Sequence, residues 1–210
     1  MGDNTNTLMR CTQNPTIAEE WRRGWHPEII PTMNEPDPYL IVGGGPAGLE
    51  ATRALVQRGA DVTLSEASTT WGGRVTLESA LPGLSAWGRV RDWRLWQLQQ
   101  SPNAELYLDS RLEASDILEF GIPHVALATG STWRNDGVGR AHRRPLDFLD
   151  PTRVLTPDDI MAKSAAAVTA DGPVVIFDDD HFYMASVLAE LLANAGREVV
   201  FVTPAPVVSQ

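Results

Sequence analysis

The fold is set by residues 39–66, which read YLIVGGGPAGLEATRALVQRGADVTLSE. A short apolar run comes first, and a glycine-rich turn follows it. Apolar residues then recur at helical spacing as far as Gly59, and residues 61–66 alternate like a strand. Strand, glycine turn, helix and strand within about thirty residues form a βαβ unit, which nearly always crosses over right-handed. The stretch therefore predicts a parallel α/β sheet.

The glycines of this turn have the spacing that dinucleotide binding requires. Gly43 would permit a tight turn, Gly45 would let backbone approach a diphosphate, and Gly48 would let the helix pack close to the strand. Amides at the helix N-terminus would face the phosphates, and the helix dipole would add to the attraction. Glu66 ends the second strand, where a carboxylate binds ribose hydroxyls and repels a 2′-phosphate. We therefore expect FAD, ADP or NAD rather than NADP, the alternative being a glycine turn without a ligand.

Two later segments are typical of flavin-dependent enzymes. Residues 71–74 read WGGR, in which adjacent glycines would let a second stretch of backbone approach the phosphates and Arg74 would offset their charge. Arg74 reads equally well as an ordinary exposed arginine. Residues 124–130, HVALATG, predict a buried strand that runs into a turn. The candidate nucleotide contacts are thus Gly43, Gly45, Pro46, Ala47, Gly48, Glu66, Ala67, Gly72, Gly73, Arg74, Thr129 and Gly130.

A second βαβ start occupies residues 173–202, with a strand at 173–177, a helix over 181–196 and a strand at 198–202. Its turn carries three aspartates at 178–180 in place of glycines. Like charges ~4 Å apart repel by about 4 kcal/mol at an effective dielectric near 20, so a diphosphate would be disfavoured there. We expect no NAD(P) in this unit and interpret Asp180 as a helix N-cap. A divalent-metal site on the aspartates is the less favoured alternative.

The predicted fold class is a three-layer FAD/NAD(P)-binding Rossmann-like α/β domain with a second, truncated Rossmann-like unit. The expected domains are an N-terminal arm and linker (1–38), an ADP/FAD-binding domain (39–155) and a partial NAD-like domain with a degenerate glycine turn (156–210). Further elements are expected as a strand at 104–109 and as helices over 85–100, over 115–120 and from Thr156. Three tryptophans of the helix over 85–100 would pack in the core or at a domain contact, namely Trp87, Trp93 and Trp96.

Composition limits the other possibilities. The 210 residues are 43% hydrophobic and 21% charged, with 17 Lys+Arg against 27 Asp+Glu and a net charge of −10. Such a chain can bury a core, and its excess of acid argues against nucleic acid or anionic membrane as a partner. We expect a cytoplasmic protein, because neither a secretory signal nor an apolar stretch of ~20 residues is visible. The one cysteine, Cys11, excludes an internal disulfide, and the four histidines lack metal-ligand or triad spacing, which disfavours hydrolysis.

Seven segments, in order, carry a resemblance to a known family. From Cys11 to Thr203 the chain closely resembles the trimethylamine, dimethylamine and histamine dehydrogenases, with compatible spacing, whereas old-yellow-enzyme-type dienoyl-CoA reductases are more distant. The segments are CTQNPTIAEEWRRGWHPE (11–28), IVGGGPAGLEA (41–51), WGGR (71–74), ALPGL (80–84), ALATG (126–130), LTPDDIM (155–161) and VVIFDDDHFYMASVLAELLANAG (174–196).

The resemblance implies an enzyme of several parts. In that family an N-terminal TIM barrel carries covalent FMN and the amine site, a four-iron, four-sulfur cluster follows, and an ADP- or FAD-binding domain with an inserted NAD-like domain comes next. Electrons pass from the amine to FMN, to the cluster and to an electron-transferring flavoprotein. Position by position, Cys11 matches the last of four cluster ligands, and the glycines and Glu66 match the ADP-binding fingerprint.

The chain also departs from the family pattern. It has no barrel, and three close cysteines do not precede Cys11, whose thiolate alone cannot hold a four-iron cluster. In this chain alone Cys11 would be a spare thiol. We therefore expect the C-terminal, ADP- or FAD-binding part of an oxidoreductase, with a separate TIM-barrel FMN chain needed for amine oxidation. A non-redox ADP-binding structural module and an inactive fragment remain the alternatives.

Overall fold

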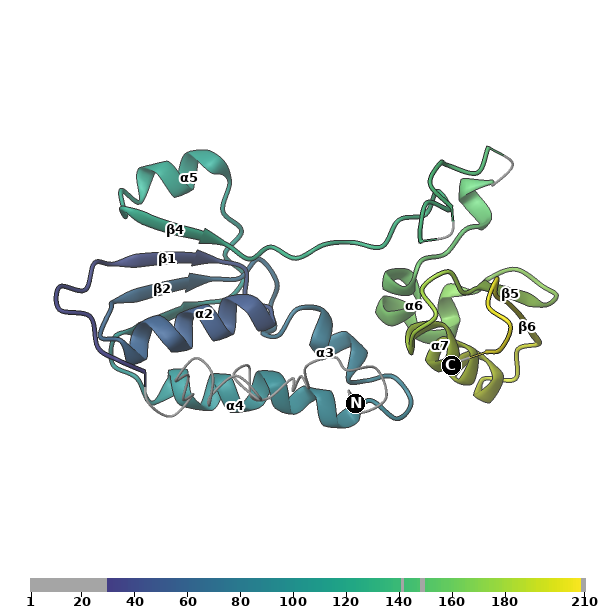
Figure 1. Ribbon diagram of the computed structural model, residues 1–210, viewed down its shortest axis with the longest axis horizontal. Coiled ribbons are helices and arrows are strands. Elements are labelled where there is room, and N and C mark those ends of the chain that lie inside the picture. Colours follow the sequence, from purple (N-terminus) through teal and green to yellow (C-terminus); the bar gives the residue numbers. More distant parts are fainter. Residues whose placement is uncertain (1–29, 141, 148–149, 209–210) are drawn as a thin grey trace. The chain divides into compact units, whose positions relative to one another are not determined.

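The computed structural model describes residues 30–140, 142–147 and 150–208 (Figure 1). These residues divide into two compact units. The first unit holds residues 30–76 and 87–130, and the second holds 77–86 and 131–208. This division does not coincide with the domain boundary expected after residue 155. Most of the expected arm lies outside the described residues.

A four-stranded parallel sheet forms the centre of the first unit. Its spatial order is β3-β2-β1-β4. The strands are β1 (Tyr39–Val42), β2 (Val62–Ser65), β3 (Ala104–Tyr107) and β4 (His124–Leu127). The register sets Val42 level with both Ser65 and Leu127. The carboxyl ends of β1, β2 and β4 therefore meet at one edge, and the chain reverses its direction of winding between β1 and β4, where open α/β sheets bind ligands.

Helices α2 (Pro46–Gln57) and α4 (Gly88–Gln99) cover one face of this sheet (Figure 1). Shorter helices are α3 (Arg74–Glu78), α5 (Ala114–Glu119) and a 3₁₀ turn at Ser85–Trp87. The alternating apolar positions of the strands pack with α2 and α4 into one core, whose fully buried members are Ile41, Leu49, Val56, Ala60, Val62, Leu64 and Leu98. Each such leucine or isoleucine contributes about 1.5–3 kcal/mol by burial.

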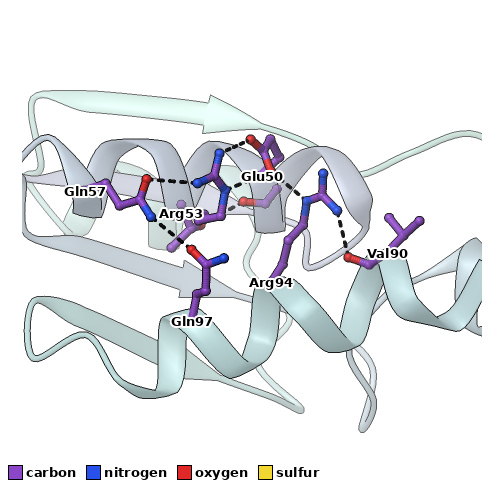
Figure 2. A network of polar contacts seen from close by, with 8 residues as sticks. Glu50, Arg53, Gln57, Val90, Arg94 and Gln97 are labelled. Atoms are coloured by element: carbon purple, nitrogen blue, oxygen red, sulfur yellow. Dashed lines mark hydrogen bonds and ion pairs between the residues drawn. The ribbon is translucent and has the colours of Figure 1, made fainter. Parts of the chain in front are cut away.

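Polar residues join α2 to α4 beside this core (Figure 2). The Glu50 carboxylate accepts hydrogen bonds from Arg53 at 2.6 Å and from Arg94 at 2.7 Å, and both arginine side chains are almost fully buried. Gln57 donates to Gln97 across the same helix pair at 2.9 Å. Burial acts to raise the pKa of Glu50, but the hydrogen bonds and charges of the two arginines outweigh it and hold the pKa below its usual value.

Two side-chain expectations for this unit differ from the structure. Of the two alternatives for the tryptophans, core packing is wrong for Trp93 and Trp96, which are 41% and 63% exposed, and a domain contact stays a prediction. The Trp93 ring lies beneath the guanidinium groups of Arg53 and Arg94. The strand at β4 is not buried either, because Val125 and Leu127 are 41% and 70% exposed. Helix α5 lies beyond β4 and away from α2 (Figure 1), and its six residues leave Val125 and Leu127 exposed.

The second unit contains one βαβ element, as expected. Strands β5 (Val174–Phe177) and β6 (Val199–Val202) pair in parallel, with α7 (Met184–Asn194) between them in sequence. Helix α6 (Pro157–Lys163) begins at a capping box, and 3₁₀ turns occupy Pro151–Arg153 and Ser164–Ala167. The buried core of this unit consists of Leu81, Ile160, Met184 and Leu188.

The start of α7 differs from the prediction. Asp180 is exposed and is not the N-cap, since the helix begins at Met184 with Tyr183 before it. His181 has a left-handed backbone with φ of +56°, which no residue of a right-handed helix adopts, so the helix cannot include His181 or begin at Asp180. The backbone N–H of His181 donates instead to the Asp178 carboxylate, at 3.0 Å.

Candidate functional site

The first glycine turn closes directly on the ends of its strands. Gly43 has φ of +108°, and an added Cβ would overlap the carbonyl oxygen of Ala128, at the end of β4. A Cβ at Gly48 would overlap the carbonyl oxygen of Gly43 itself. Both positions therefore exclude every side chain, one through conformation and contact and the other through close packing of the helix.

Gly45 is different, because an added Cβ there would meet no atom within 4 Å. Its φ of −73° is open to any residue, so neither strain nor packing in the chain requires a glycine at this position. The residue stands at the N-cap of α2, where no side chain caps the helix and the first turn has no acidic residue. The first amides of a helix lack intrahelical partners, so this end presents donors and a positive dipole to an anion.

The carboxylate of Glu66 lies at the glycine turn. Its Oε2 accepts the backbone N–H of Gly44 at 2.6 Å, and its Oε1 accepts the N–H of Ser68 at 2.8 Å. The residue is half-buried and follows β2 directly. Each carboxylate oxygen has a second lone pair, so both can still accept a hydrogen bond from a diol.

The second glycine loop packs against the first. The N–H of Gly72 donates to the carbonyl of Gly44 at 2.8 Å. A Cβ added at Gly73 would lie 3.3 Å from the Cα of Gly45, and one added at Gly44 would lie 2.5 Å from the Trp71 ring. The two loops thus form one surface, with Gly45 at its edge.

The remaining candidates lie around this surface. The backbone of Thr129 is 3.0 Å from the Cβ position of Gly43, while Gly130 is exposed with φ of +76°. Arg74 is half-buried at the start of α3. The other three candidates are exposed residues of the first turn and of the segment after β2, namely Pro46, Ala47 and Ala67.

Neither a metal site nor a membrane helix is found in the part of the chain that the structure describes. Within it, no three histidine, cysteine, aspartate or glutamate side chains are grouped so that they could hold a metal ion. None of the helices in residues 30–140, 142–147 and 150–208 is long and apolar enough to cross a bilayer. Cys11, the candidate iron–sulfur ligand, lies outside the described residues.

The second turn is filled by its own side chains. Asp178, in the position that corresponds to Gly43, is only 2% exposed. Beside it, a Cβ added at Gly139 would overlap the Asp179 carboxylate. At the end of β6, Thr203 takes the place that Glu66 has in the first unit, and its hydroxyl lies 3.2 Å from Nδ1 of His181.

Sequence reasoning missed two residues of the first site. Gly44 donates to Glu66 and accepts from Gly72, although it occupies a variable position of the glycine motif. Trp71 packs against Gly44, which its place before two glycines only hinted at. Both depend on contacts between segments far apart in the sequence, which the spacing of a motif does not contain.

Comparisons with known proteins agree with this geometry. Residues 41–103 match the family model of the NAD(P)-binding Rossmann-like domain. Dimethylamine dehydrogenase from Hyphomicrobium sp. (strain x) is 38% identical over 200 residues, which cover 92% of this chain and 27% of that protein.

Two solved structures are also similar. Histamine dehydrogenase from Rhizobium sp. 4-9 is 56% identical, with a TM-score of 0.92, over 100% of this chain and 30% of the other. The 6-hydroxypseudooxynicotine amine oxidase HisD from Pseudomonas geniculata N1 is 47% identical, also with a TM-score of 0.92, over 98% of this chain and 30% of the other. The chain thus spans about three tenths of the length of these relatives. It belongs to the family of trimethylamine, dimethylamine and histamine dehydrogenases, and it corresponds to a Rossmann-like, nucleotide-binding portion of those proteins.

Proposed function

We propose that the first unit binds the ADP moiety of an adenine nucleotide, either ADP itself or FAD. One observation carries the proposal: the Glu66 carboxylate is bonded to the Gly44 N–H, next to a glycine whose Cβ direction is open. A diphosphate needs backbone that it can approach, and a ribose needs a carboxylate one step further along the sheet edge. The first turn offers both.

Eight of the twelve candidate residues would contact or attract the nucleotide in this proposal. The diphosphate would lie over Gly45 and the first turn of α2, where amides and the helix dipole attract it. The ribose hydroxyls would donate to the remaining lone pairs of Glu66, which would repel a 2′-phosphate. Arg74 would offset phosphate charge. Five further residues would contact the nucleotide through backbone or small side chains, namely Pro46, Ala47, Ala67, Thr129 and Gly130.

The second unit binds no nicotinamide nucleotide in this proposal. Its turn carries a buried carboxylate at Asp178, and Asp179 fills the neighbouring space. A diphosphate placed there would have to displace these carboxylates or lie against their charge, and both are unfavourable. The absence of a carboxylate at Thr203 also removes the ribose contact.

The larger function is that of an oxidoreductase component. The named relatives are amine dehydrogenases and an amine oxidase, and this chain matches about three tenths of their length. Amine oxidation would then need an FMN-carrying TIM barrel from a separate chain, and electrons would leave to an electron-transferring flavoprotein. Cys11 would bind an iron–sulfur cluster only if a partner supplied three more cysteines. Purified alone, the chain should not reduce a dye in the presence of dimethylamine or histamine, and turnover by the chain alone would contradict this.

Two rivals share the same site, because Gly45 and Glu66 would recognise only the ADP moiety. In one, ADP is a structural prop without redox chemistry; in the other, the chain is an inactive fragment. The test is to denature the purified protein and to identify any released nucleotide by its absorbance. A visible flavin band indicates FAD, and adenine absorbance alone indicates the ADP prop. A protein that retains no nucleotide and binds no added ADP would contradict the proposal.

A further inference from the structure

Helix α4 reaches the back of the second glycine loop. Gly72 has φ of +100°, and a Cβ added there would lie 2.8 Å from Cδ of Arg91 and would overlap the hydroxyl oxygen of Thr76. The side chains of Arg91 and Thr76 thus lie against the one face of Gly72 that a larger residue would fill. All of these residues belong to the first unit.

A directed chain of hydrogen bonds runs through these side chains. Nη1 of Arg91 donates to the Thr76 hydroxyl at 3.0 Å, and that hydroxyl donates its own proton to the carbonyl of Trp71 at 2.7 Å. Nε of Arg91 also donates to Asp92 at 2.7 Å, and the arginine side chain is 26% exposed. The guanidinium is therefore fixed by protein groups rather than turned toward the glycine surface.

The opposite side of the loop contacts the nucleotide-binding turn. Trp71 packs against Gly44, and the Gly72 N–H donates to the Gly44 carbonyl at 2.8 Å. The loop is thus held between the first glycine turn on one side and the Arg91–Thr76 pair on the other. A loop so held has few ways to move away from a diphosphate lying over Gly45.

We propose that Arg91 and Thr76 form a latch that positions the second glycine loop and so sets the affinity for the diphosphate of the nucleotide. This inference rests on the proposed function of the first unit. Arg91 acts as a positioning residue, because its donors are directed at Thr76 and Asp92. Preorganised loops bind more tightly because less ordering remains to be done on binding.

The test compares ADP with adenosine, which lacks the diphosphate. Calorimetric titrations would use the wild-type chain and the variants Arg91→Ala, Arg91→Lys and Thr76→Val. Arg89→Ala is the matched control, since Arg89 is an exposed arginine of the same helix. We expect Arg91→Ala and Thr76→Val each to raise the Kd for ADP by about tenfold, the loss typical of one hydrogen bond to a charged group. Adenosine binding should change less than about twofold, and Arg89→Ala should match the wild type.

Three further results sharpen the test. Arg91→Lys should recover part of the ADP affinity, because a lysine retains the alkyl contact with Gly72 and one donor. The double variant should lose less than the sum of the two single losses, since the residues act through one chain of bonds. Equal losses for ADP and adenosine, accompanied by a lower denaturation midpoint, would overturn the latch in favour of a purely structural role. Failure of the wild type to bind ADP would instead overturn the proposed function.

Discussion

The two βαβ units of this chain have the same topology, but the turns after their first strands contain different residues: glycines in the first and aspartates in the second. After β1, Gly43 and Gly45 leave bare backbone, and the space in the Cβ direction of Gly45 is open. After β5, Asp178 is buried and accepts the His181 N–H at 3.0 Å. The N-terminus of α2 has no side-chain cap and can present its first amides to a ligand, while the second turn bonds the His181 N–H with a carboxylate of its own.

Under the proposed function, the turn rather than the fold decides which of the two units binds a diphosphate. Both units have parallel strands with a helix between them in sequence, although α2 begins at Pro46, soon after β1 ends at Val42, and α7 begins only at Met184, after β5 ends at Phe177. What differs is where the carboxylate lies. In the second turn a buried carboxylate, Asp178, stands at the position that Gly43 has in the first, whereas Glu66 bonds the Gly44 N–H from the end of the neighbouring strand. A carboxylate inside the turn would oppose a phosphate through both space and charge.

The largest expected effect is a loss of stability on adding a methyl group at Gly48, where α2 packs against the first glycine turn. Gly48→Ala should lower the free energy of unfolding by about 3 kcal/mol or more, because its methyl group would overlap the Gly43 carbonyl and force α2 away from β1. Urea denaturation followed by circular dichroism measures this. A loss below about 1 kcal/mol would mean that α2 does not pack as described.

A neighbouring glycine should separate binding from stability. Gly45→Ala should leave the free energy of unfolding within about 0.5 kcal/mol of the wild type, because no atom lies within 4 Å of the new methyl group. The Kd for ADP should nevertheless rise by about tenfold or more, which is about 1.4 kcal/mol. Calorimetric titration of the variant and the wild type with ADP checks this, and unaltered ADP affinity would argue against a diphosphate at Gly45. The variant should also show no residual NADH binding, since the second turn offers none.

A substitution in the second turn should lower stability without changing ADP affinity, the reverse of Gly45→Ala. Asp178→Ala should cost about 1–3 kcal/mol of stability, because the buried His181 N–H interaction is lost, and should leave ADP affinity unchanged. Asp180→Ala, at an exposed neighbouring carboxylate, is the control and should be nearly neutral. Thermal denaturation with and without ADP measures both quantities. Weakened ADP binding in Asp178→Ala would break the distinction between the two turns.

A smaller effect is expected from the polar contacts between α2 and α4. The pKa of Glu50 is lower in the folded chain than its ordinary value of 4.5, so its ionised carboxylate stabilises the fold above pH 4.5. That contribution is lost as the pH falls through the lower, folded-state pKa. The stability difference between the wild type and Glu50→Gln should therefore shrink below pH 4.5, as measured by urea denaturation at a series of pH values. A difference that stays constant or grows on acidification would contradict the ion pairs with Arg53 and Arg94.

Local patterns predicted the fold well. The strands, α2 and the placing of Glu66 follow from periodicity and from the spacing of glycines within one βαβ unit. Residues that depend on contacts between distant segments were not found this way: Trp71 packs on Gly44 across the turn, and Trp96 is exposed, so core packing, one of the two alternatives for it, is wrong. The N-cap at Asp180 was wrong: the His181 N–H donates to Asp178, His181 has a positive φ, and the helix begins only at Met184. A sequence shows which residues could cap a turn, but not which of three adjacent carboxylates does so.

The most direct test of the central claim is a crystal structure of the chain with ADP. The account predicts a diphosphate over Gly45 at the start of α2, a ribose within hydrogen-bond distance of Glu66, and a second turn in which Asp178 still accepts the His181 N–H. Nucleotide bound at the second turn, or a first turn that stays empty under saturating ADP, would contradict it.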